Sequence, residues 1–173
     1  MTPLPDTAAG ASELVFRVAT SEDVARIASW NQQLIADEGA GSAMDAMSVD
    51  QLESRMRTWL SGDYRALVFE ARATPTSAAE AVAYALIRDT REWIHLRQFF
   101  VVRNRRRRGI GARAVALLRE RVFEHDKPVI VEAMTWNHAA LSFWRAVGFA
   151  DRYVGLESRS GASGPRSPSG AAS

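Results

Sequence analysis

The hydrophobic and polar positions of the chain follow two periods, which divide most of it into strands and helices. Runs rich in β-branched and aromatic residues predict strands, at residues 14–19, 64–73, 81–88, 93–102, 129–134 and 149–156. Apolar residues at helical spacing predict helices, over about residues 21–35, 49–60, 109–124 and 138–147. These elements predict an α/β (α+β) domain in which a sheet of about six strands is flanked by four helices.

Local signals mark the boundaries of several of these elements. Thr20 or Ser21 can cap the first helix, and Ser48 with Gln51 forms a capping box for the second. Asn137 can cap the last helix, which we expect to end at Gly148. Residues 1–12 predict a flexible leader and residues 158–173, rich in Ser, Gly, Ala and Pro, a disordered tail. The segment 13–157 is then a single domain.

The composition excludes several classes of protein. Apolar residues make up 47% of the 173 residues and charged residues 24%, which is typical of a soluble globular domain. Cys is absent, which excludes a disulfide framework, a thiolate zinc site and a cysteine nucleophile, and fits the reducing cytoplasm. The spacing of the 3 His residues suggests no metal site. No signal peptide and no apolar run of membrane-spanning length is present, so we expect no membrane partner.

A basic turn precedes the third predicted helix. Arg105 to Arg108 is an unbroken basic run, and Gly109-Ile110-Gly111 follows it at the start of the helix. The first N–H groups of a helix lack internal partners and carry partial positive charge, so the turn predicts a seat for a phosphate group. The alternative is a solvated turn with no ligand.

Three other phosphate-binding interpretations are weaker. The P-loop pattern is absent. Gly109 to Ala114 fits a relaxed dinucleotide fingerprint, with Glu132 as a ribose-binding acid, but a long basic turn separates the first glycine from its strand. Nucleic-acid binding through Arg103 to Arg108 is disfavoured, because the net charge is only +2 and the basic residues cluster locally.

Two motifs resemble a known family. Arg106-x-x-Gly109-x-Gly111 resembles the acetyl-CoA signature Arg/Gln-x-x-Gly-x-Gly/Ala of the GNAT N-acetyltransferases. The stretch from Asn137 to Phe149 resembles the family's second motif, Asn-x-x-Ala-x-x-x-Tyr-x-x-x-Gly-Phe, and one helix and one strand separate the two. The resemblance implies a mixed, mostly antiparallel sheet whose splayed middle strands receive the pantetheine arm. It also implies acetyl transfer from acetyl-CoA, as co-substrate, to a primary amine by direct attack in a ternary complex.

The resemblance assigns the cofactor-binding residues. The strand supplies main-chain groups, and the N–H of Phe100 or Val101 is expected to bind the thioester carbonyl. The complete set is Phe99, Phe100, Val101, Arg106, Arg107, Arg108, Gly109, Ile110, Gly111, Ala112 and Asn137.

Glu132 is the first candidate for the general base. It precedes Asn137 by the spacing of the proposed base in the resembling ribosomal-protein N-terminal acetyltransferases. Its alternation with Ile130 and Met134 predicts an apolar face, where burial would raise the pKa of the carboxyl group. A purely structural glutamate is the alternative. Glu70 is the second candidate.

Other polar residues have weaker claims to a role. Gln98 and His95 could orient water or substrate, although His95 fits a packed or surface histidine better than a base. An acyl-enzyme is disfavoured, because Cys and the Gly-x-Ser-x-Gly elbow are absent.

Trp144 departs from the family pattern, because it occupies the position of the acid-catalyst tyrosine. Its indole N–H donates a hydrogen bond but does not release a proton near neutral pH. The thiolate would then leave unassisted, or Tyr153, Tyr84 or water would protonate it.

The sequence leaves the acceptor open between a small-molecule amine and a peptide N-terminus. The acids Asp37, Glu38 and Glu70 favour a cationic small molecule weakly. A homodimer is possible. The alternative function is a non-catalytic acyl-CoA-binding or regulatory module of the same fold.

Overall fold

The computed structural model describes residues 13–39, 47–72, 74 and 76–155. The predicted leader at 1–12, the tail at 158–173 and the last residues of the predicted domain lie outside the described residues.

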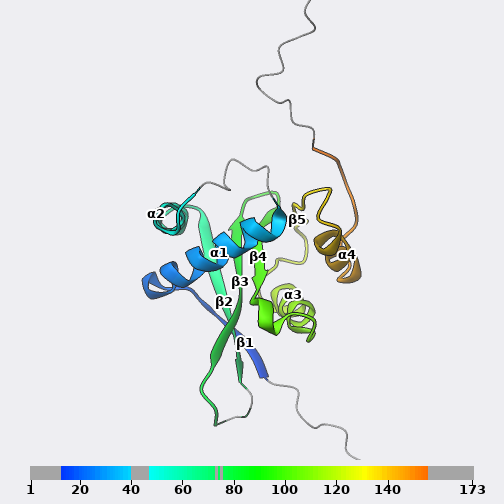
Figure 1. The fold of residues 1–173 in the computed structure, drawn as a ribbon. Helices are drawn as coiled ribbons and strands as arrows, with labels where there is room; N and C mark the ends of the chain where they lie inside the picture. The colour runs from blue at the N-terminus through cyan, green and yellow to red at the C-terminus, as the bar shows by residue number, and fades with distance from the viewer. Residues whose placement is uncertain (1–12, 40–46, 73, 75, 156–173) are drawn as a thin grey trace, which may run out of the picture.

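One mixed sheet forms the centre of the protein (Figure 1). Its first four strands are antiparallel to their neighbours, and the fifth is parallel to the fourth. The mixed, mostly antiparallel sheet is therefore confirmed. In spatial order the strands are β1 (Glu13–Val18), β2 (Tyr64–Arg72), β3 (Glu80–Asp89), β4 (Ile94–Val101) and β5 (Val129–Val131).

Helices cover both faces of the sheet (Figure 1). One face packs against α1 (Val24–Glu38) and α2 (Val49–Leu60). The other packs against α3 (Ile110–Arg121) and α4 (His138–Ala146). Two short 3-10 helices, η1 (Ser21–Asp23) and η2 (Arg103–Arg105), precede α1 and follow β4. The four predicted helices are confirmed.

The predicted caps explain where two of these helices begin. The Ser48 side chain accepts from the N–H of Gln51, and the Gln51 side chain accepts from the N–H of Ser48. The Asn137 side chain accepts from the N–H of Ala140 at 3.0 Å. Gly148 follows α4 with a φ of 89°, a left-handed conformation that favours glycine.

The predicted strand over 149–156 is not formed in its described part, residues 149–155. Phe149 packs its ring against Trp144, with the centroids 5.1 Å apart, and so anchors the chain to α4. The side chains of Tyr153 and Val154 then lie 66% and 70% exposed. A strand needs a neighbour to satisfy its main-chain groups, and β5 is too short to provide one. Among the described residues the sheet therefore has five strands.

The middle strands diverge, as predicted. β5 ends at Val131 rather than at Met134, so its parallel ladder with β4 covers only Ile94 to Leu96. The chain that leaves β5 turns toward α1, where the indole N–H of Trp136 donates to the carbonyl oxygen of Glu38 at 2.8 Å. The second half of β4 consequently has an open edge.

A bulge in β4 changes which side chains face α1 and α2. The register shift between Leu86 and Ile87 leaves Arg97 as an extra residue in β4. The Arg97 guanidinium lies over the ring of Trp59 in α2, and the neighbouring Gln98 binds Asn31 in α1. In a regular strand the side chains of Arg97 and Gln98 would point to opposite faces of the sheet. The bulge allows both to point toward α1 and α2.

Candidate functional site

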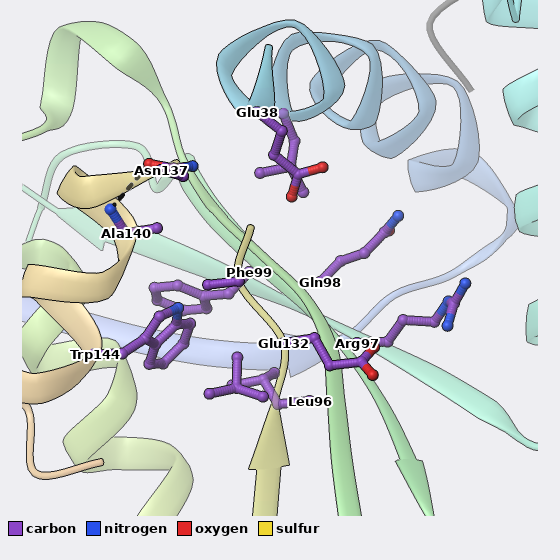
Figure 2. Close-up of a pocket in the computed structure, with 12 residues that line it drawn as sticks. Glu38, Leu96, Arg97, Gln98, Phe99, Glu132, Asn137, Ala140 and Trp144 are labelled. Atoms are coloured by element: carbon purple, nitrogen blue, oxygen red, sulfur yellow. Dashed lines mark hydrogen bonds between the residues drawn. The ribbon is translucent and has the colours of Figure 1, made fainter. Parts of the chain in front are cut away.

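A cleft of about 60 Å³ lies where β4 and β5 separate (Figure 2). The end of α1, the loop after β5 and the start of α4 complete its walls. The lining residues are Leu34, Glu38, Leu96, Arg97, Gln98, Phe99, Val131, Glu132, Ala133, Asn137, Ala140 and Trp144.

The wall on the side of α4 is aromatic. The ring of Phe99 stacks on Phe143 at 5.9 Å and lies 5.5 Å from Trp144. Trp144 is only 8% exposed and also contacts Phe149. No hydrogen-bond acceptor for its indole N–H is present among the described residues. Trp144 therefore forms part of the cleft wall, and its indole N–H is available as a hydrogen-bond donor.

The opposite wall is polar and partly rigid. Arg97 and Gln98 extend away from α4, and Glu38 reaches the cleft from the end of α1 (Figure 2). The Tyr84 hydroxyl donates to Gln98 at 3.1 Å, and the Gln98 amide donates to Asn31 at 2.8 Å. This buried chain holds Gln98 in one orientation.

Tyr84 is unsuited to the role of acid that the sequence left open for it. Its side chain is fully buried and its hydroxyl is hydrogen-bonded to Gln98. Burial, with a smaller contribution from the charge of Glu38, raises the pKa of Tyr84 far above its usual value. Tyr84 therefore retains its proton.

Glu132 lies at the cleft, but its predicted burial is wrong. Its side chain is 63% exposed, because the chain leaves the sheet after Val131 and no helix covers the carboxylate. Its Oε2 atom lies 3.5 Å from Nε2 of His95 on β4. The parallel register explains this pair, since His95 lies opposite Ile130, which faces the same side as Glu132.

His95 does not line the cleft itself, but its contact with Glu132 connects it to the cleft. Burial lowers its pKa, the nearby Glu132 opposes this shift, and the charges of Arg97 and Arg88 add to it. The imidazole is therefore neutral near pH 7 and able to accept a proton. Only the strand pairing reveals the contact with Glu132.

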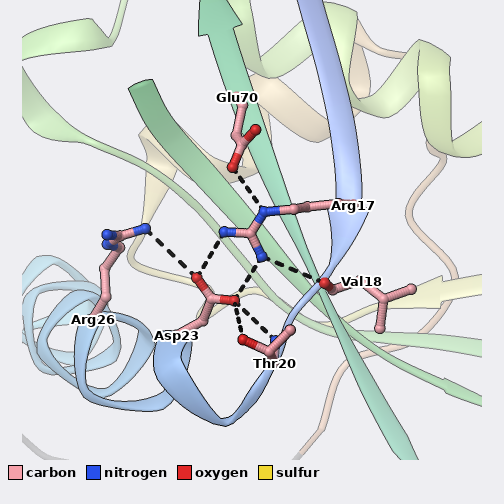
Figure 3. A network of polar contacts seen from close by, with 6 residues as sticks. All are labelled: Arg17, Val18, Thr20, Asp23, Arg26 and Glu70. Carbon is pink, nitrogen blue, oxygen red and sulfur yellow. Dashed lines mark hydrogen bonds and ion pairs between the residues drawn. The ribbon is translucent and has the colours of Figure 1, made fainter. Parts of the chain in front are cut away.

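Glu70 does not line the cleft and is removed from the candidate bases. Its carboxylate accepts from Nε of Arg17 at 2.8 Å (Figure 3). The same guanidinium binds Asp23 through two hydrogen bonds, of 2.6 and 2.9 Å. The network joins β1, β2 and the start of α1, so Glu70 stabilises the fold.

The basic turn leaves its main-chain amides open. Arg107 and Gly109 have φ values of 61° and 75°. Among the described residues, the N–H groups of residues 107–112 have no assigned acceptor, and the helical ladder begins with Arg113, which donates to Gly109. Apart from Gly109 and its two chain neighbours, no atom of the described residues lies within 4 Å of where a Cβ at Gly109 would be. This arrangement can hold an anion.

The arginines of the turn divide into two groups. Arg106 donates to Asp37 at 2.6 Å and to the carbonyl oxygen of Val101 at 2.9 Å, so the protein itself occupies its guanidinium. Arg107 and Arg108 are exposed and have no partner among the described residues. These two are the arginines available to a phosphate.

The rest of the basic run is neutralised. Arg103 donates to Asp37 at 2.7 Å, and Arg105 forms an ion pair with Glu80. These pairs reduce the local positive potential and weigh further against nucleic acid as the ligand.

The open edge of β4 presents particular amides. The N–H of Val102 donates to Val82 in β3 at 2.9 Å. By the alternation of an antiparallel ladder, the N–H of Phe100 also points to β3, whereas those of Phe99 and Val101 point to the open edge. Of the two expected carbonyl donors, Val101 fits and Phe100 does not.

The remaining expected cofactor residues are Ile110, Gly111, Ala112 and Asn137, and their surroundings differ. Ile110 is 6% exposed and packs in the core below the turn, and Ala112 is exposed. A Cβ at Gly111 would lie 3.1 Å from the ring of Phe143, so this glycine allows α3 to approach α4 closely. The Asn137 side chain caps α4.

Residues 13–39, 47–72, 74 and 76–155 contain neither a metal site nor a helix that could cross a membrane. No group of three or more His, Asp or Glu side chains there is placed to hold a metal ion. No helix in these ranges has the length and apolar character needed to cross a membrane.

The fold and the cleft define an α/β domain whose sheet is split between β4 and β5. The model of the Acetyltransferase (GNAT) family matches residues 40–149, and the chain belongs to this family. No curated protein matches the chain.

Solved structures share the fold at low sequence identity. A possible acetyltransferase from Clostridium difficile 630 is 17% identical with a TM-score of 0.64, over 85% of this chain and 97% of the other. Aminoglycoside N-acetyltransferase AAC(6')-Iy in complex with CoA is 15% identical with a TM-score of 0.62, over 87% and 97%. Ribosomal-protein-alanine N-acetyltransferase from Brucella melitensis biovar Abortus 2308 is 13% identical with a TM-score of 0.61, over 84% and 98%.

Proposed function

We propose that the protein transfers an acetyl group from acetyl-CoA to a primary amine, by direct attack in a ternary complex. The observation that carries this proposal is the cleft between β4 and β5, flanked by unpaired main-chain N–H groups on the β4 edge and at the start of α3. A structural neighbour in complex with CoA supports the same co-substrate.

The residues present fit acetyl-CoA. The open amides between Arg107 and Ala112 bind the pyrophosphate, and the charges of Arg107 and Arg108 add to the attraction. The pantetheine amides pair with main-chain groups of Phe99 on the open edge of β4, in the manner of an added strand. The acetyl group then lies in the cleft.

The reaction requires a neutral amine at the thioester carbonyl carbon. As the C–N bond forms, negative charge grows on the carbonyl oxygen, and the N–H of Val101 stabilises it. His95, oriented by Glu132, accepts the amine proton, directly or through water. The C–S bond then breaks.

The leaving thiolate departs without a protein acid. The Trp144 indole does not release a proton near neutral pH, and thiols ionise with a pKa of about 8.5. Trp144 therefore shapes the acetyl site and excludes water from it.

The test is release of free thiol from acetyl-CoA in the presence of a panel of primary amines. His95→Gln and Glu132→Gln are expected to lower kcat by about a hundredfold or more, because general base catalysis contributes this much. Glu120→Gln, an exposed carboxylate on α3, is the matched control and keeps wild-type kcat. Acetyl-CoA binding without turnover of any amine, unchanged in Glu132→Gln, would instead identify a non-catalytic acyl-CoA-binding module.

We propose a small-molecule amine or a peptide N-terminus as the acceptor. Neighbours named as aminoglycoside and ribosomal-protein-alanine N-acetyltransferases support a small-molecule amine or a peptide N-terminus as acceptor. A cytoplasmic location and a homodimer stay predictions, and size-exclusion chromatography with light scattering tests the latter.

A further inference from the structure

Among the described residues, two arginines near the cleft have no carboxylate partner: Arg97, which lines it, and Arg88, which lies opposite His95 in the strand register. Arg97 lines the cleft with its guanidinium 5.0 Å from the ring centroid of Trp59. Arg88 lies 5.6 Å from the ring centroid of Tyr64, and its Nε atom is buried with no hydrogen-bond acceptor. Within the described ranges, neither arginine forms an ion pair or a hydrogen bond.

This lack of partners contrasts with two other half-buried arginines, Arg17 and Arg106. Arg17 and Arg106 each bind carboxylates, because a cation withdrawn from water requires compensation. Among the described residues, the only compensation for Arg88 and Arg97 is the face of an aromatic ring. A guanidinium that lies over a ring keeps its N–H edges available for an anion.

The two arginines are held on one platform. The rings of Trp59 and Tyr64 contact each other at 5.6 Å, so the two guanidinium groups are stacked on neighbouring supports. His95 lies opposite Arg88 in the strand register, and the charges of both arginines act on its pKa. The positive charge therefore gathers next to the candidate base.

The acids that favoured a cationic acceptor are largely neutralised. Asp37 is bound by two arginines, and Glu70 is bound by Arg17 outside the cleft. Of the carboxylates, Glu38 and Glu132 line the cleft, and Arg97 faces it with them. The cleft thus offers groups of both signs, which suits an acceptor that carries a cationic amine and an anion.

We propose that the acceptor is an amino acid or a related amine that bears a carboxylate, and that Arg97 and Arg88 bind this carboxylate. The inference rests on the proposed acetyltransferase function and narrows its substrate class. A carboxylate matches the two parallel N–H bonds that a guanidinium donates. It also supplies the missing partner of both arginines. The amine of the same molecule then points toward His95 and Glu132.

The experiment compares acceptors that differ only in the carboxylate. Free amino acids, their amides and the corresponding decarboxylated amines are assayed by thiol release with the wild-type protein and with Arg97→Gln and Arg88→Gln. We expect wild-type kcat/KM to be at least about tenfold higher for the carboxylates, the range of a charge-assisted hydrogen bond. Each variant should raise KM for the carboxylates by a similar factor, with kcat little changed and the amides unaffected.

Two further variants separate binding from folding. Arg97→Lys keeps the charge and should restore part of the preference, although it loses the bidentate geometry. Arg72→Gln removes an exposed arginine at the opposite end of β2 and should behave as wild type. Circular dichroism melting confirms that each variant is folded.

The outcomes distinguish this inference from the proposed function. Equal or better turnover of amides or decarboxylated amines by the wild type overturns the inference and leaves the acetyltransferase proposal intact. Equal losses for all acceptors in Arg97→Gln overturn it as well. If no amine is acetylated although acetyl-CoA binds, the proposed function fails. Calorimetric binding of amino acids to the CoA-loaded protein then decides: weaker binding to Arg97→Gln supports the inference, and equal or absent binding overturns it.

Discussion

Replacing Gly109 by alanine tests directly whether the main-chain amides of the basic turn bind a phosphate group. Gly109 has a φ of 75°, and no atom of the described residues other than Gly109 and its two chain neighbours lies within 4 Å of the position that a Cβ would take. The substitution therefore destabilises the folded protein only through the left-handed backbone conformation, which costs a residue with a side chain about 1–2 kcal/mol. At about 2–4 °C per kcal/mol for a domain of this size, we expect Tm to fall by about 2–8 °C.

The effect on acetyl-CoA should be larger than the effect on folding. The new methyl group projects into the open space next to the unpaired amides, and relief of the strain would turn the amide of Ile110 away. Loss of one hydrogen bond to a charged group costs about 1.5–3 kcal/mol, or about 10- to 100-fold in affinity. Isothermal titration calorimetry with CoA measures this change, and kcat at saturating acetyl-CoA should be preserved.

Gly111→Ala is the matched control two residues further along the chain. Its Cβ would lie 3.1 and 3.2 Å from two atoms of the Phe143 ring, so it overpacks α3 against α4. Overpacking costs about 1–3 kcal/mol, partly offset by the better helix propensity of alanine. CoA affinity should change little. Wild-type affinity in Gly109→Ala would refute anion binding by the amides of this turn.

Three further predictions follow from the polar and aromatic contacts. Glu132→Gln should lower the pKa of His95 and Arg97→Gln should raise it, because the carboxylate favours the imidazolium and the guanidinium opposes it. NMR titration of the imidazole measures both shifts. Shifts in the opposite directions would contradict the site geometry. Asp23, whose pKa a guanidinium hydrogen bond lowers from 3.8 to about 2, stabilises the fold fully above pH 3.8 and loses this effect as the pH falls through 2. Asp23→Asn should therefore lower the free energy of unfolding by about 1–2 kcal/mol at pH 7, with a smaller difference in urea titrations near pH 3; an equal difference at both pH values would exclude the carboxylate as the cause. Trp144→Phe should retain most of kcat, since the indole supplies no proton, and a loss of about a hundredfold would assign its N–H a role in catalysis.

The local chemistry of the sequence was sufficient for the four helices, the first five strands and the motifs. Ser48 and Asn137 cap helices through contacts within a few residues, and Gly109 takes a left-handed conformation at a helix start. These features depend on neighbours along the chain, so a single sequence reveals them. The family motifs predicted the fold for the same reason, because each motif consists of residues that lie close together along the chain.

The tertiary structure alone decided which charged groups are available. Glu70 is an ordinary strand glutamate in the sequence, and only the pairing of β1 with β2 brings Arg17 to it. Arg97 and Gln98 both lie on the polar wall of the cleft because a bulge breaks the alternation of β4. An ion pair, a bulge and a strand register are set by residues far apart along the chain. Their energies depend on packing that no local pattern contains.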